Sequence, residues 1–358
     1  MRRWGMLAGG TVLLVALGFV FVRAPADIET FVRSPTTPSA VPTAFIIFGG
    51  DMMFDRSIRT TMEEKGGDFI FSCIDGILQG ADLVVANLEG PITSHESVSV
   101  GTLPGGEGNY TFTFPTSTAK LLFAHNIRLV NIGNNHIMNF GREGLAQTKQ
   151  LLGEAGVGYF GDPFDAIVAH RDIQGVRLAF ISYNEFAPGG WKESASTTLR
   201  EIHAALSEKY APIVYTHWGD EYVSPPSRVK QLARSFVEAG AEIVIGSHPH
   251  VVQEHELYAS TTLTTSSSTT PSFEGSSGLS EPIEGTTSSS TPFDTVQGKT
   301  LTASKHIYYS LGNFIFDQYW DETVRRGLLL RVELTPTGVV SVEEIPIDNQ
   351  TDRRTCAA

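Results

Sequence analysis

Six apolar runs of strand length constrain this fold most, because each run ends in a cluster of polar residues. They are AFIIFGGD (44–51), DLVVANLEGP (82–91), IRLVNIGNNH (127–136), RLAFISYNE (177–185), PIVYTHWGDEY (212–222) and AEIVIGSHPH (241–250). Segments 141–156 and 227–241 lie between such runs, carry apolar residues at helical spacing and end near glycine. The alternation predicts an α/β domain whose polar residues gather past the strand ends, on one edge of a sheet.

The remaining segments set the expected boundaries of this domain at residues 44–347. Residues 305–318 predict a strand that breaks at Gly312 and Asn313, and residues 325–347 predict a terminal hairpin. The interval of about 259–300 is rich in Ser and Thr, which predicts a disordered surface insertion whose deletion leaves folding intact. Residues 348–358 predict a polar, frayed tail.

The N-terminal segment carries a membrane signal. Arg2 and Arg3 precede an apolar stretch from Trp4 to Val22, which favours an uncleaved signal anchor over residues 1–23 that spans the lipid bilayer. Residues 24–43 are rich in Pro, Ser and Thr and predict a linker. We therefore expect a single-pass protein of the cell membrane with its domain on the extracytoplasmic side. The small residues at 24–26 leave a cleaved signal peptide, and hence secretion, as the alternative.

Composition excludes some classes of protein. The chain has 358 residues, of which 41% are hydrophobic, so disorder throughout is excluded. A formal charge of -13 without clustered Lys and Arg argues against nucleic acid as a partner. Cys73 and Cys356 are far apart and indicate no disulfide framework; we expect Cys73 to be a buried, inert thiol.

The polar ends of the runs offer oxygen and imidazole donors. Such mixtures bind divalent Mn, Fe or Zn, and two nearby ions can activate water and polarise a phosphoryl or carbonyl oxygen. Taken alone, Asp51 is more often a helix cap and His217 more often a satisfied histidine than a ligand, and Glu89 can be a turn residue. The whole set favours a metal site: Asp51, Glu89, Asn135, His136, His217, His248 and His250.

Six of these segments, in this order, resemble the CapA-type proteins of poly-γ-glutamate capsule synthesis, whose domain is similar to a divergent calcineurin-like metallophosphoesterase. The matching segments are GGDMMFDR, VVANLEGPIT, NIGNNHIMNFG, THWGDEY, IGSHPHVVQ and YYSLGNFIFDQ. The resemblance spans residues 44 to about 333. It implies a four-layer α/β/β/α sandwich, preceded here by the N-terminal transmembrane helix.

The resemblance also implies a role for each donor. Asp51, Glu89 and His250 would hold one metal ion, and Glu89, Asn135, His217 and His248 a second, with His136 as the general acid. Met53 stands where metallophosphoesterases have a histidine ligand, so a single ion is the alternative to a pair. Asn139 stands where the family usually has Asp, which is expected to weaken a hydrogen bond to His136.

Further positions near the same strand ends are expected to bind substrate. An arginine can clamp a carboxylate or phosphate, and Trp218 or Tyr222 can form the floor of a pocket, with core packing as the alternative for both aromatics. The expected substrate-binding residues are Arg56, Trp218, Glu221, Tyr222, Asn313 and Asp317.

Three functions follow from the resemblance and the residues. The first is a membrane-anchored component for synthesis or export of an extracellular anionic polymer such as poly-γ-glutamate, with the polymer or its synthase complex as partner. The second is a metal-dependent hydrolase of phosphoesters or amides, in which His136 is the acid. The third is a degenerate scaffold that binds the cell envelope. The acidic net charge fits the first poorly, because capturing a polyanion requires a basic groove or bridging cations.

Overall fold

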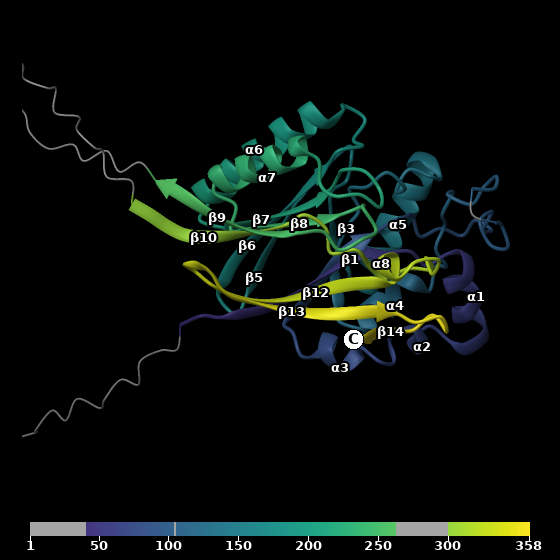
Figure 1. Ribbon diagram of the computed structural model, residues 1–358. Coiled ribbons are helices and arrows are strands. Elements are labelled where there is room, and N and C mark those ends of the chain that lie inside the picture. The colour runs from purple at the N-terminus through teal and green to yellow at the C-terminus, as the bar shows by residue number, and fades with distance from the viewer. Residues whose placement is uncertain (1–40, 104, 263–299) are drawn as a thin grey trace, which may run out of the picture. The chain divides into compact units, whose positions relative to one another are not determined.

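The computed structural model describes residues 41–103, 105–262 and 300–358, which belong to one compact unit (Figure 1). The predicted transmembrane helix (1–23), nearly all of the linker (24–43) and most of the predicted insertion (263–299) lie outside the described residues. Within the described part of the chain, no helix combines the length and apolar character needed to cross a bilayer.

The fold is mixed α/β, with two sheets. The larger sheet has eight strands in the order β14-β13-β12-β1-β2-β3-β4, and β11 pairs with β1 off this path. Strands β1 to β4 run parallel, whereas β12, β13 and β14 are antiparallel additions. The strands are β1 Ala44–Met52, β2 Leu83–Leu88, β3 Ile127–Asn131, β4 Gly158–Phe160, β11 Asn313–Ile315, β12 Arg326–Thr335, β13 Gly338–Asn349 and β14 Thr355–Ala357.

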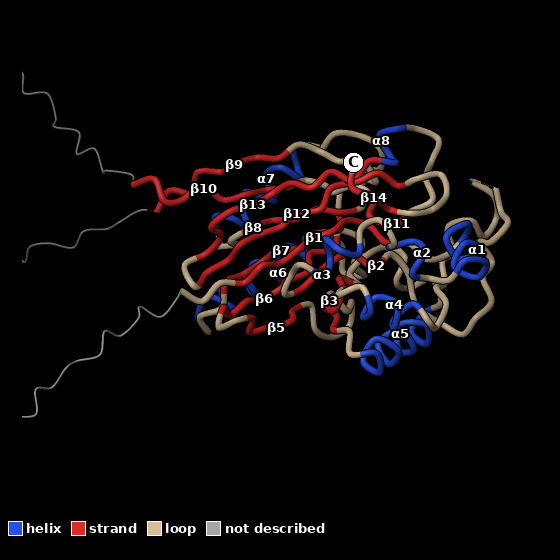
Figure 2. Tube along the Cα trace, turned by 90° about the horizontal axis from the view of Figure 1, so that it is seen from below, coloured by secondary structure: helices blue, strands red, loops and turns tan. Residues whose placement is uncertain are grey.

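The smaller sheet has six strands in the order β5-β6-β7-β8-β10-β9 (Figure 2). Its central strands are parallel, and the edge strands β5 and β9 are antiparallel to their neighbours. The strands are β5 Val168–Ile173, β6 Val176–Asn184, β7 Ala211–His217, β8 Ile243–Ser247, β9 His255–Thr262 and β10 Thr300–Tyr308. Strands β9 and β10 thus occupy the ends of the interval predicted as disordered.

Helices cover the outer face of each sheet. Helices α1 to α5 contribute buried residues to the core on the larger sheet, and α6 and α7 to the core on the smaller one (Figure 1). The helices are α1 Arg56–Lys65, α2 Asp68–Phe71, α3 Asp75–Gln79, α4 Thr118–Ala124, α5 Gly141–Ala155, α6 Trp191–Ser207, α7 Ser227–Glu238 and α8 Glu322–Arg325. The predicted helices 141–156 and 227–241 correspond to α5 and α7.

The apolar runs are continuous because the central strands are buried on both faces. In β1, Ile47 packs under the helices while Ile46 and Phe48 point into the layer between the sheets. In β7, Val214 faces α6 and α7, whereas Tyr215 faces the other sheet. Since successive side chains alternate between faces, every position in such a strand needs an apolar residue.

Two expectations about the cysteines and the tail are wrong. Cys73 and Cys356 form a disulfide, with Cα atoms 4.8 Å apart although 283 residues separate them. The C-terminal residues, expected to fray, form β14, which pairs with β13 from Ile347 to Asn349. Sequence distance carries no information on a pairing that depends on tertiary proximity, and the polar tail is ordered by a strand partner and a cross-link.

Candidate metal centre

The donor residues lie where strands of both sheets end. Asp51 is in β1, Glu89 follows β2 and Asn135 follows β3, all from the larger sheet. His217 ends β7, and His248 and His250 follow β8 in the smaller sheet. The expectation of one sheet edge is therefore corrected: two sheets supply the donors, and their parallel strands point the same ends toward one site.

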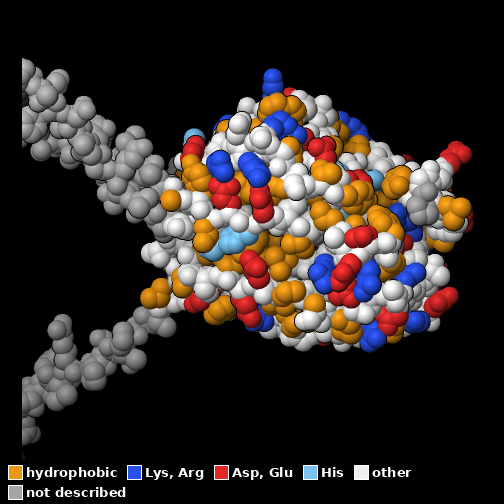
Figure 3. All heavy atoms as spheres, in the orientation of Figure 1, with side chains coloured by type: hydrophobic (Ala, Val, Ile, Leu, Met, Phe, Trp, Pro, Cys, Tyr) orange, Lys and Arg blue, Asp and Glu red, His pale blue; other side chains and the backbone are white. Residues whose placement is uncertain are grey.

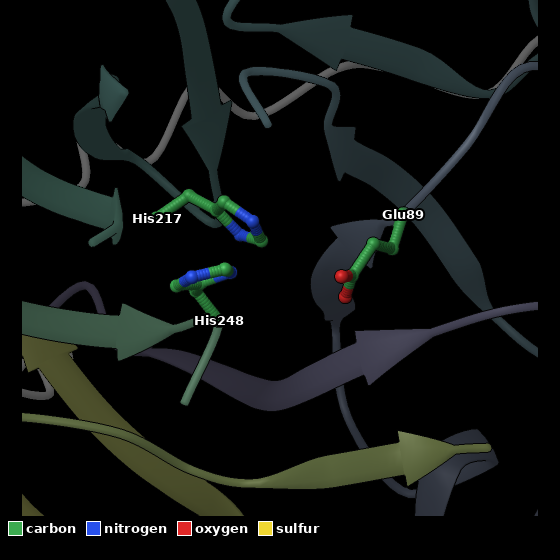
Figure 4. A group of neighbouring side chains, drawn as sticks. All are labelled: Glu89, His217 and His248. Carbon is green, nitrogen blue, oxygen red and sulfur yellow. The ribbon is translucent and has the colours of Figure 1, made fainter. Parts of the chain in front are cut away.

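Two groups of three side chains bring their ligand atoms close together. Asp51, Glu89 and His250 form one group, Glu89, His217 and His248 form the other, and within each group the atoms lie within 4.8 Å of one another. Figure 4 shows Glu89 from one side of the site facing the two imidazoles of the second group. These are the groupings that the resemblance implies, with Glu89 shared. The structure thus brings the predicted ligands together, and their metal-binding role stays a prediction.

Glu89 gives the strongest sign that the residues fit a cation. Its side chain is fully buried, yet neither carboxylate oxygen has a hydrogen-bond partner among the described residues. The nearest imidazole nitrogens are Nε2 of His250 at 3.5 Å and Nε2 of His136 at 4.0 Å, both from Oε1. A buried carboxylate without partners is costly, and a bound cation would remove that cost. Nδ1 of His248 is likewise buried and unpartnered.

Hydrogen bonds orient two of the imidazoles toward the centre. Ser247 Oγ donates to the Thr216 carbonyl at 2.8 Å, so it accepts from Nδ1 of His217 at 3.0 Å. This leaves the Nε2 lone pair of His217 facing Oδ1 of Asn135 at 3.0 Å. Two facing acceptors are satisfied by a shared cation, which is how neutral imidazole and an amide oxygen ligate metals.

His250 is held in the same way by Asn313. The amide nitrogen of Asn313 donates to Oε1 of Gln318 at 3.0 Å and to the Val324 carbonyl at 2.8 Å, so its Oδ1 is the acceptor for Nδ1 of His250 at 2.9 Å. Nε2 of His250 therefore keeps its lone pair and faces Glu89. Asn313 is fully buried and orients this histidine, and its contact with substrate stays a prediction.

In the Asn-rich turn after β3, the side-chain oxygens of the asparagines make different contacts. Asn134 Oδ1 caps the turn by accepting from the backbone amides of His136 at 3.1 Å and Ile137 at 2.9 Å. Asn131 Oδ1 accepts from Ser182 Oγ at 2.8 Å in the neighbouring sheet. Asn135 faces His217, as described above. The turn is thus partly self-capping and partly a bridge between the two sheets.

Nδ1 of His136 is the donor in its contact with Asn139. Asn139 Oδ1 accepts from the Phe112 backbone amide at 2.8 Å, which fixes it as the acceptor for Nδ1 of His136 at 3.2 Å. The amide thus keeps the hydrogen bond that was expected to weaken, although without a negative charge. Burial lowers the pKa of His136 to about 4, so its neutral form, with a free Nε2 toward Glu89, prevails at neutral pH.

The loop after β8 reaches the centre through strained backbone. His248 has φ 98° and His250 has φ 57°, both in the left-handed region that few residues with a Cβ adopt. The backbone amide of His248 donates to Oδ2 of Asp51 at 2.9 Å, which ties this loop to β1 of the other sheet. Gly246 precedes it because a Cβ there would lie 1.9 Å from the Tyr309 carbonyl oxygen.

Burial sets the charges at the centre. It raises the pKa of Asp51 to about 6, and it raises the pKa of Glu89 well above its usual value, with the Asp51 charge adding to the effect. Burial lowers the pKa of His248 to about 4 and that of His250 well below its usual range. The imidazoles are therefore neutral at pH 7 and ready to ligate, Asp51 is mostly ionised, and a cation would displace the proton that the raised pKa of Glu89 favours.

Met53 is a core residue. Its side chain is fully buried among the residues beneath the helices of the larger sheet, and its sulfur accepts from the Asp55 backbone amide at 3.0 Å. Met53 therefore packs against the turn after β1. Among the described residues, the donors of the first group are Asp51, Glu89 and His250.

The expected substrate residues divide into three kinds of environment. Arg56, Tyr222 and Asp317 line a pocket of about 530 Å³ beside the centre. Glu221 is exposed, and its carboxylate lies within 4.8 Å of ligand atoms of His248 and His250. Trp218 is fully buried in the core under α6 and α7, and its Nε1 donates to the Tyr309 carbonyl at 2.9 Å. Substrate contact by Trp218 is therefore corrected to core packing.

Several residues that shape the site have no distinguishing pattern in the sequence. Asn87 Nδ2 donates to Oδ1 of Asp51 at 2.8 Å. Ser247 and Gln318 act through His217 and Asn313, and Arg353 lines the pocket from the C-terminal segment. Only the position of Asn87, two residues before Glu89 at the end of a strand, offered a signal.

Comparisons with known proteins agree with this geometry. The family described as "Bacterial capsule synthesis protein PGA_cap" matches residues 45–318, more than half of the chain. The "PGA biosynthesis protein CapA" of Bacillus subtilis (strain 168) is 27% identical over 317 residues, which cover 84% of this chain and 70% of the relative. The "Capsule biosynthesis protein CapA" of Bacillus anthracis is 25% identical over 320 residues, which cover 84% of this chain and 66% of the relative, just under two thirds of its length. The chain belongs to the bacterial capsule synthesis protein PGA_cap family and is a relative of the CapA proteins.

Proposed function

We propose that this protein acts in the synthesis or export of an extracellular anionic polymer of the poly-γ-glutamate type, as a metal-dependent hydrolase with a metallophosphoesterase-like four-layer α/β/β/α fold. The observation that carries the catalytic part is the buried carboxylate of Glu89, unpartnered and shared by two groups of ligand atoms. The polymer part is supported by the family and by the names of the two relatives.

The chain's own residues define the chemistry proposed here. Asp51, Glu89 and His250 would hold one divalent ion, and Glu89, Asn135, His217 and His248 a second. Such ions supply Lewis-acid polarisation of a phosphoryl or carbonyl oxygen and activation of water. His136 presents a neutral Nε2 with a free lone pair 4.0 Å from Oε1 of Glu89, so it would have to take up a proton at Nε2 before passing it to the leaving group.

We place the domain outside the cytoplasmic membrane, anchored by residues 1–23, with the polymer and its synthase complex as partners. The disulfide between Cys73 and Cys356 supports this location, because such bonds persist in oxidising compartments and are rare in the cytosol. The interspersed acidic and basic side chains in Figure 3 give one face of the domain no single sign of charge. Contacts with a polyanion are therefore expected to be local.

The test uses the full chain purified in detergent. Bound Mn, Fe and Zn are measured by elemental analysis, and hydrolysis is assayed on a phosphomonoester, a phosphodiester and a γ-glutamyl oligomer with added Mn. We expect stoichiometric metal and an activity that falls at least about 100-fold in His136→Ala, since a general acid contributes rate factors of this size. His203→Ala is the matched control, because His203 is exposed on α6, away from the centre.

A protein that binds no metal and hydrolyses none of these substrates would refute the hydrolase. The protein would then act in polymer synthesis or export without catalysing hydrolysis. It is tested separately by deleting the gene and measuring surface polymer, with recovery by wild type and by His136→Ala. Recovery by both proteins would show that polymer synthesis does not use this chemistry.

A further inference from the structure

The pocket beside the metal centre is connected to it by hydrogen bonds. Gln318 Nε2 donates to the Tyr222 hydroxyl at 2.9 Å in the pocket wall, and Gln318 Oε1 accepts from Asn313 at 3.0 Å. Asn313 in turn holds His250. A molecule in this pocket would therefore lie against side chains that are joined to the ligands. We call it the arginine pocket, after Arg56 and Arg353 in its wall.

The two arginines differ in their partners. Arg56 forms an ion pair with Asp317, Nη2 to Oδ1 at 2.5 Å, and both side chains are largely buried. Arg353 pairs with no carboxylate among the described residues: its Nε donates to Ser57 Oγ at 2.8 Å, its Nη1 donates to the Thr351 carbonyl, and its guanidinium stacks 4.5 Å from the centre of the Tyr319 ring. One cation in the wall is therefore neutralised and the other is available.

The chain fixes Arg353 in place. It has φ 80°, and the turn around it is closed by two backbone bonds of 2.8 Å, from Arg353 to the Gln350 carbonyl and from Gln350 to the Arg354 carbonyl. Strand β14 and the disulfide at Cys356 follow directly. A guanidinium held by a strand, a cross-link and an aromatic ring loses little further freedom when it binds an anion.

The rest of the wall suits a chain with apolar stems. Tyr110, Tyr222 and Trp320 line the pocket and are 55%, 42% and 61% exposed, which is unusual for large aromatic side chains. Asp317 is paired with Arg56, but Glu64 also lines the pocket and has no ion-pair partner among the described residues, so the pocket would repel a dianion more strongly than a single carboxylate. A carboxylate on a flexible aliphatic chain matches this combination of one free guanidinium, one unpaired acid and exposed rings.

We propose that the arginine pocket is a subsite for an anionic amide polymer, in which Arg353 binds the free α-carboxylate of a γ-linked glutamate residue while the aromatic side chains cover its methylene groups. This inference rests on the proposed polymer function and adds to it the pocket that would bind the polymer and the residue that would bind its carboxylate. It also resolves how an acidic protein holds a polyanion, because the charge that binds is local and fixed.

The test measures binding apart from hydrolysis. The full-length protein, in detergent with its metal chelated, is titrated with a short γ-linked glutamate oligomer, with the same oligomer after conversion of its free carboxylates to amides, and with inorganic phosphate. We expect the charged oligomer to bind at least about tenfold more tightly than the neutral one, because a charge-assisted hydrogen bond contributes roughly this factor. Phosphate is expected to compete only weakly.

Arg353→Ala should weaken binding of the charged oligomer about tenfold and leave the neutral oligomer unchanged. Arg354→Ala is the matched control and should stay within about twofold, because the neighbouring Arg354 pairs with Asp352 and does not line the pocket. Melting temperature and metal content are measured for each variant, and Arg353→Lys paired with Arg354→Lys provides the same comparison if the alanine variants fold poorly.

Equal affinity of wild type and Arg353→Ala for the charged oligomer would overturn the inference. So would tighter binding of phosphate than of the oligomer, equal binding of the neutral oligomer, or no binding of any probe. None of these outcomes touches the hydrolase, which is read from metal content and turnover. Conversely, if the protein binds the oligomer as expected but hydrolyses no substrate, the result supports the subsite and contradicts the catalytic function.

Discussion

The metal centre and the arginine pocket lie side by side but are built in opposite ways. The centre takes buried side chains from strand ends of both sheets, and its imidazoles are aimed by fully buried neighbours such as Ser247 and Asn313. The pocket combines exposed aromatic side chains with buried and half-buried polar ones, taken from α1, from loops and from the C-terminal segment. A rigid site for chemistry can therefore adjoin a site for recognition that depends on peripheral segments.

Glu89→Gln should have the largest effect on the metal centre, and it lies outside the arginine pocket. The amide keeps the shape of the side chain but removes the charge shared by both ligand groups, so metal affinity should fall by at least about 100-fold and hydrolysis should be lost. At pH 7 the metal-free variant should be more stable than metal-free wild type by about 1–3 kcal/mol, because folding must add a proton to the buried Glu89 carboxyl, whose pKa is raised, and the amide needs none. Calorimetry and denaturant unfolding after chelation measure the two effects.

Two carboxylates outside the shared position serve as controls for Glu89→Gln. Glu64→Gln in the pocket should leave metal binding unchanged. Glu221→Gln should reduce it only slightly, because Glu221 is exposed and belongs only to the group with His248 and His250. Loss of metal in Glu221→Gln, with retention in Glu89→Gln, would show that the ion is held by the outer group and not by Glu89.

Cys356→Ser should act on the pocket and spare the centre. The cross-link closes a loop of 283 residues, and its loss should lower the free energy of unfolding by about 2–4 kcal/mol. Arg353 should lose part of its fixed position, so the charged oligomer should bind several-fold more weakly at unchanged metal content. Cys73→Ser should reproduce both effects. A parallel fall in metal affinity would mean that the two sites are one cooperative unit.

A pair of glycine substitutions compares the rigidity of the two sites. Gly246→Ala places a Cβ 1.9 Å from a backbone oxygen beneath the histidine loop, and should lower the free energy of unfolding by about 3 kcal/mol. Gly101 lines the pocket with φ 76°, and a Cβ added there would meet no atom within 4 Å, so Gly101→Ala should cost only about 1 kcal/mol. Equal losses in denaturant unfolding would contradict the contrast.

The same contrast explains what the sequence could predict. Buried parallel strands require continuous apolar runs, and their polar ends carry the donor residues, so the α/β class and the set of donors were accessible from pattern. The division of the donors into two groups came from the resemblance to the CapA-type proteins. The pocket was accessible only in part: Arg56, Tyr222 and Asp317 were among the predicted substrate residues. Arg353 and the pairing of Cys356 were not predicted, because they depend on a C-terminal segment whose composition resembles a loose tail. Trp218 was assigned to substrate because nothing in a short polar motif shows which face of the strand end points into the core.

Metal affinity should rise with pH between about 5 and 7. Burial raises the pKa of Asp51 to about 6 and that of Glu89 well above its usual value, so binding a cation must displace protons, whereas His248, with its pKa lowered to about 4, stays neutral and competes little. Each displaced proton steepens the affinity by about tenfold per pH unit. Calorimetry in buffers of different ionisation enthalpy counts these protons.

The pH dependence of thermal unfolding tests the same displacement of protons by a second measurement. A carboxyl whose folded pKa is raised contributes stability that is fully present below its unfolded pKa and is lost as pH rises through the folded value, which is about 6 for Asp51. Saturating metal removes that loss, so the metal-induced rise in melting temperature should be larger at pH 7 than at pH 5. A pH-independent rise would place the ion at groups other than these carboxyls.

Asn139→Asp should have the smallest effect and tests how finely the centre is tuned. The amide oxygen of Asn139 already accepts from Nδ1 of His136 and from the Phe112 backbone, so a carboxylate can make the same bonds without rearrangement. The added negative charge should raise the pKa of His136 from about 4 by roughly one unit, equivalent to about 1.4 kcal/mol, because it favours the imidazolium against the burial that disfavours it. NMR titration of the imidazole, compared with Asn134→Asp in the same turn, measures this shift.

If His136 holds the proton for the leaving group, the pH dependence of turnover should move by the same amount. A shifted pKa of His136 with an unchanged pH profile of turnover would contradict that role.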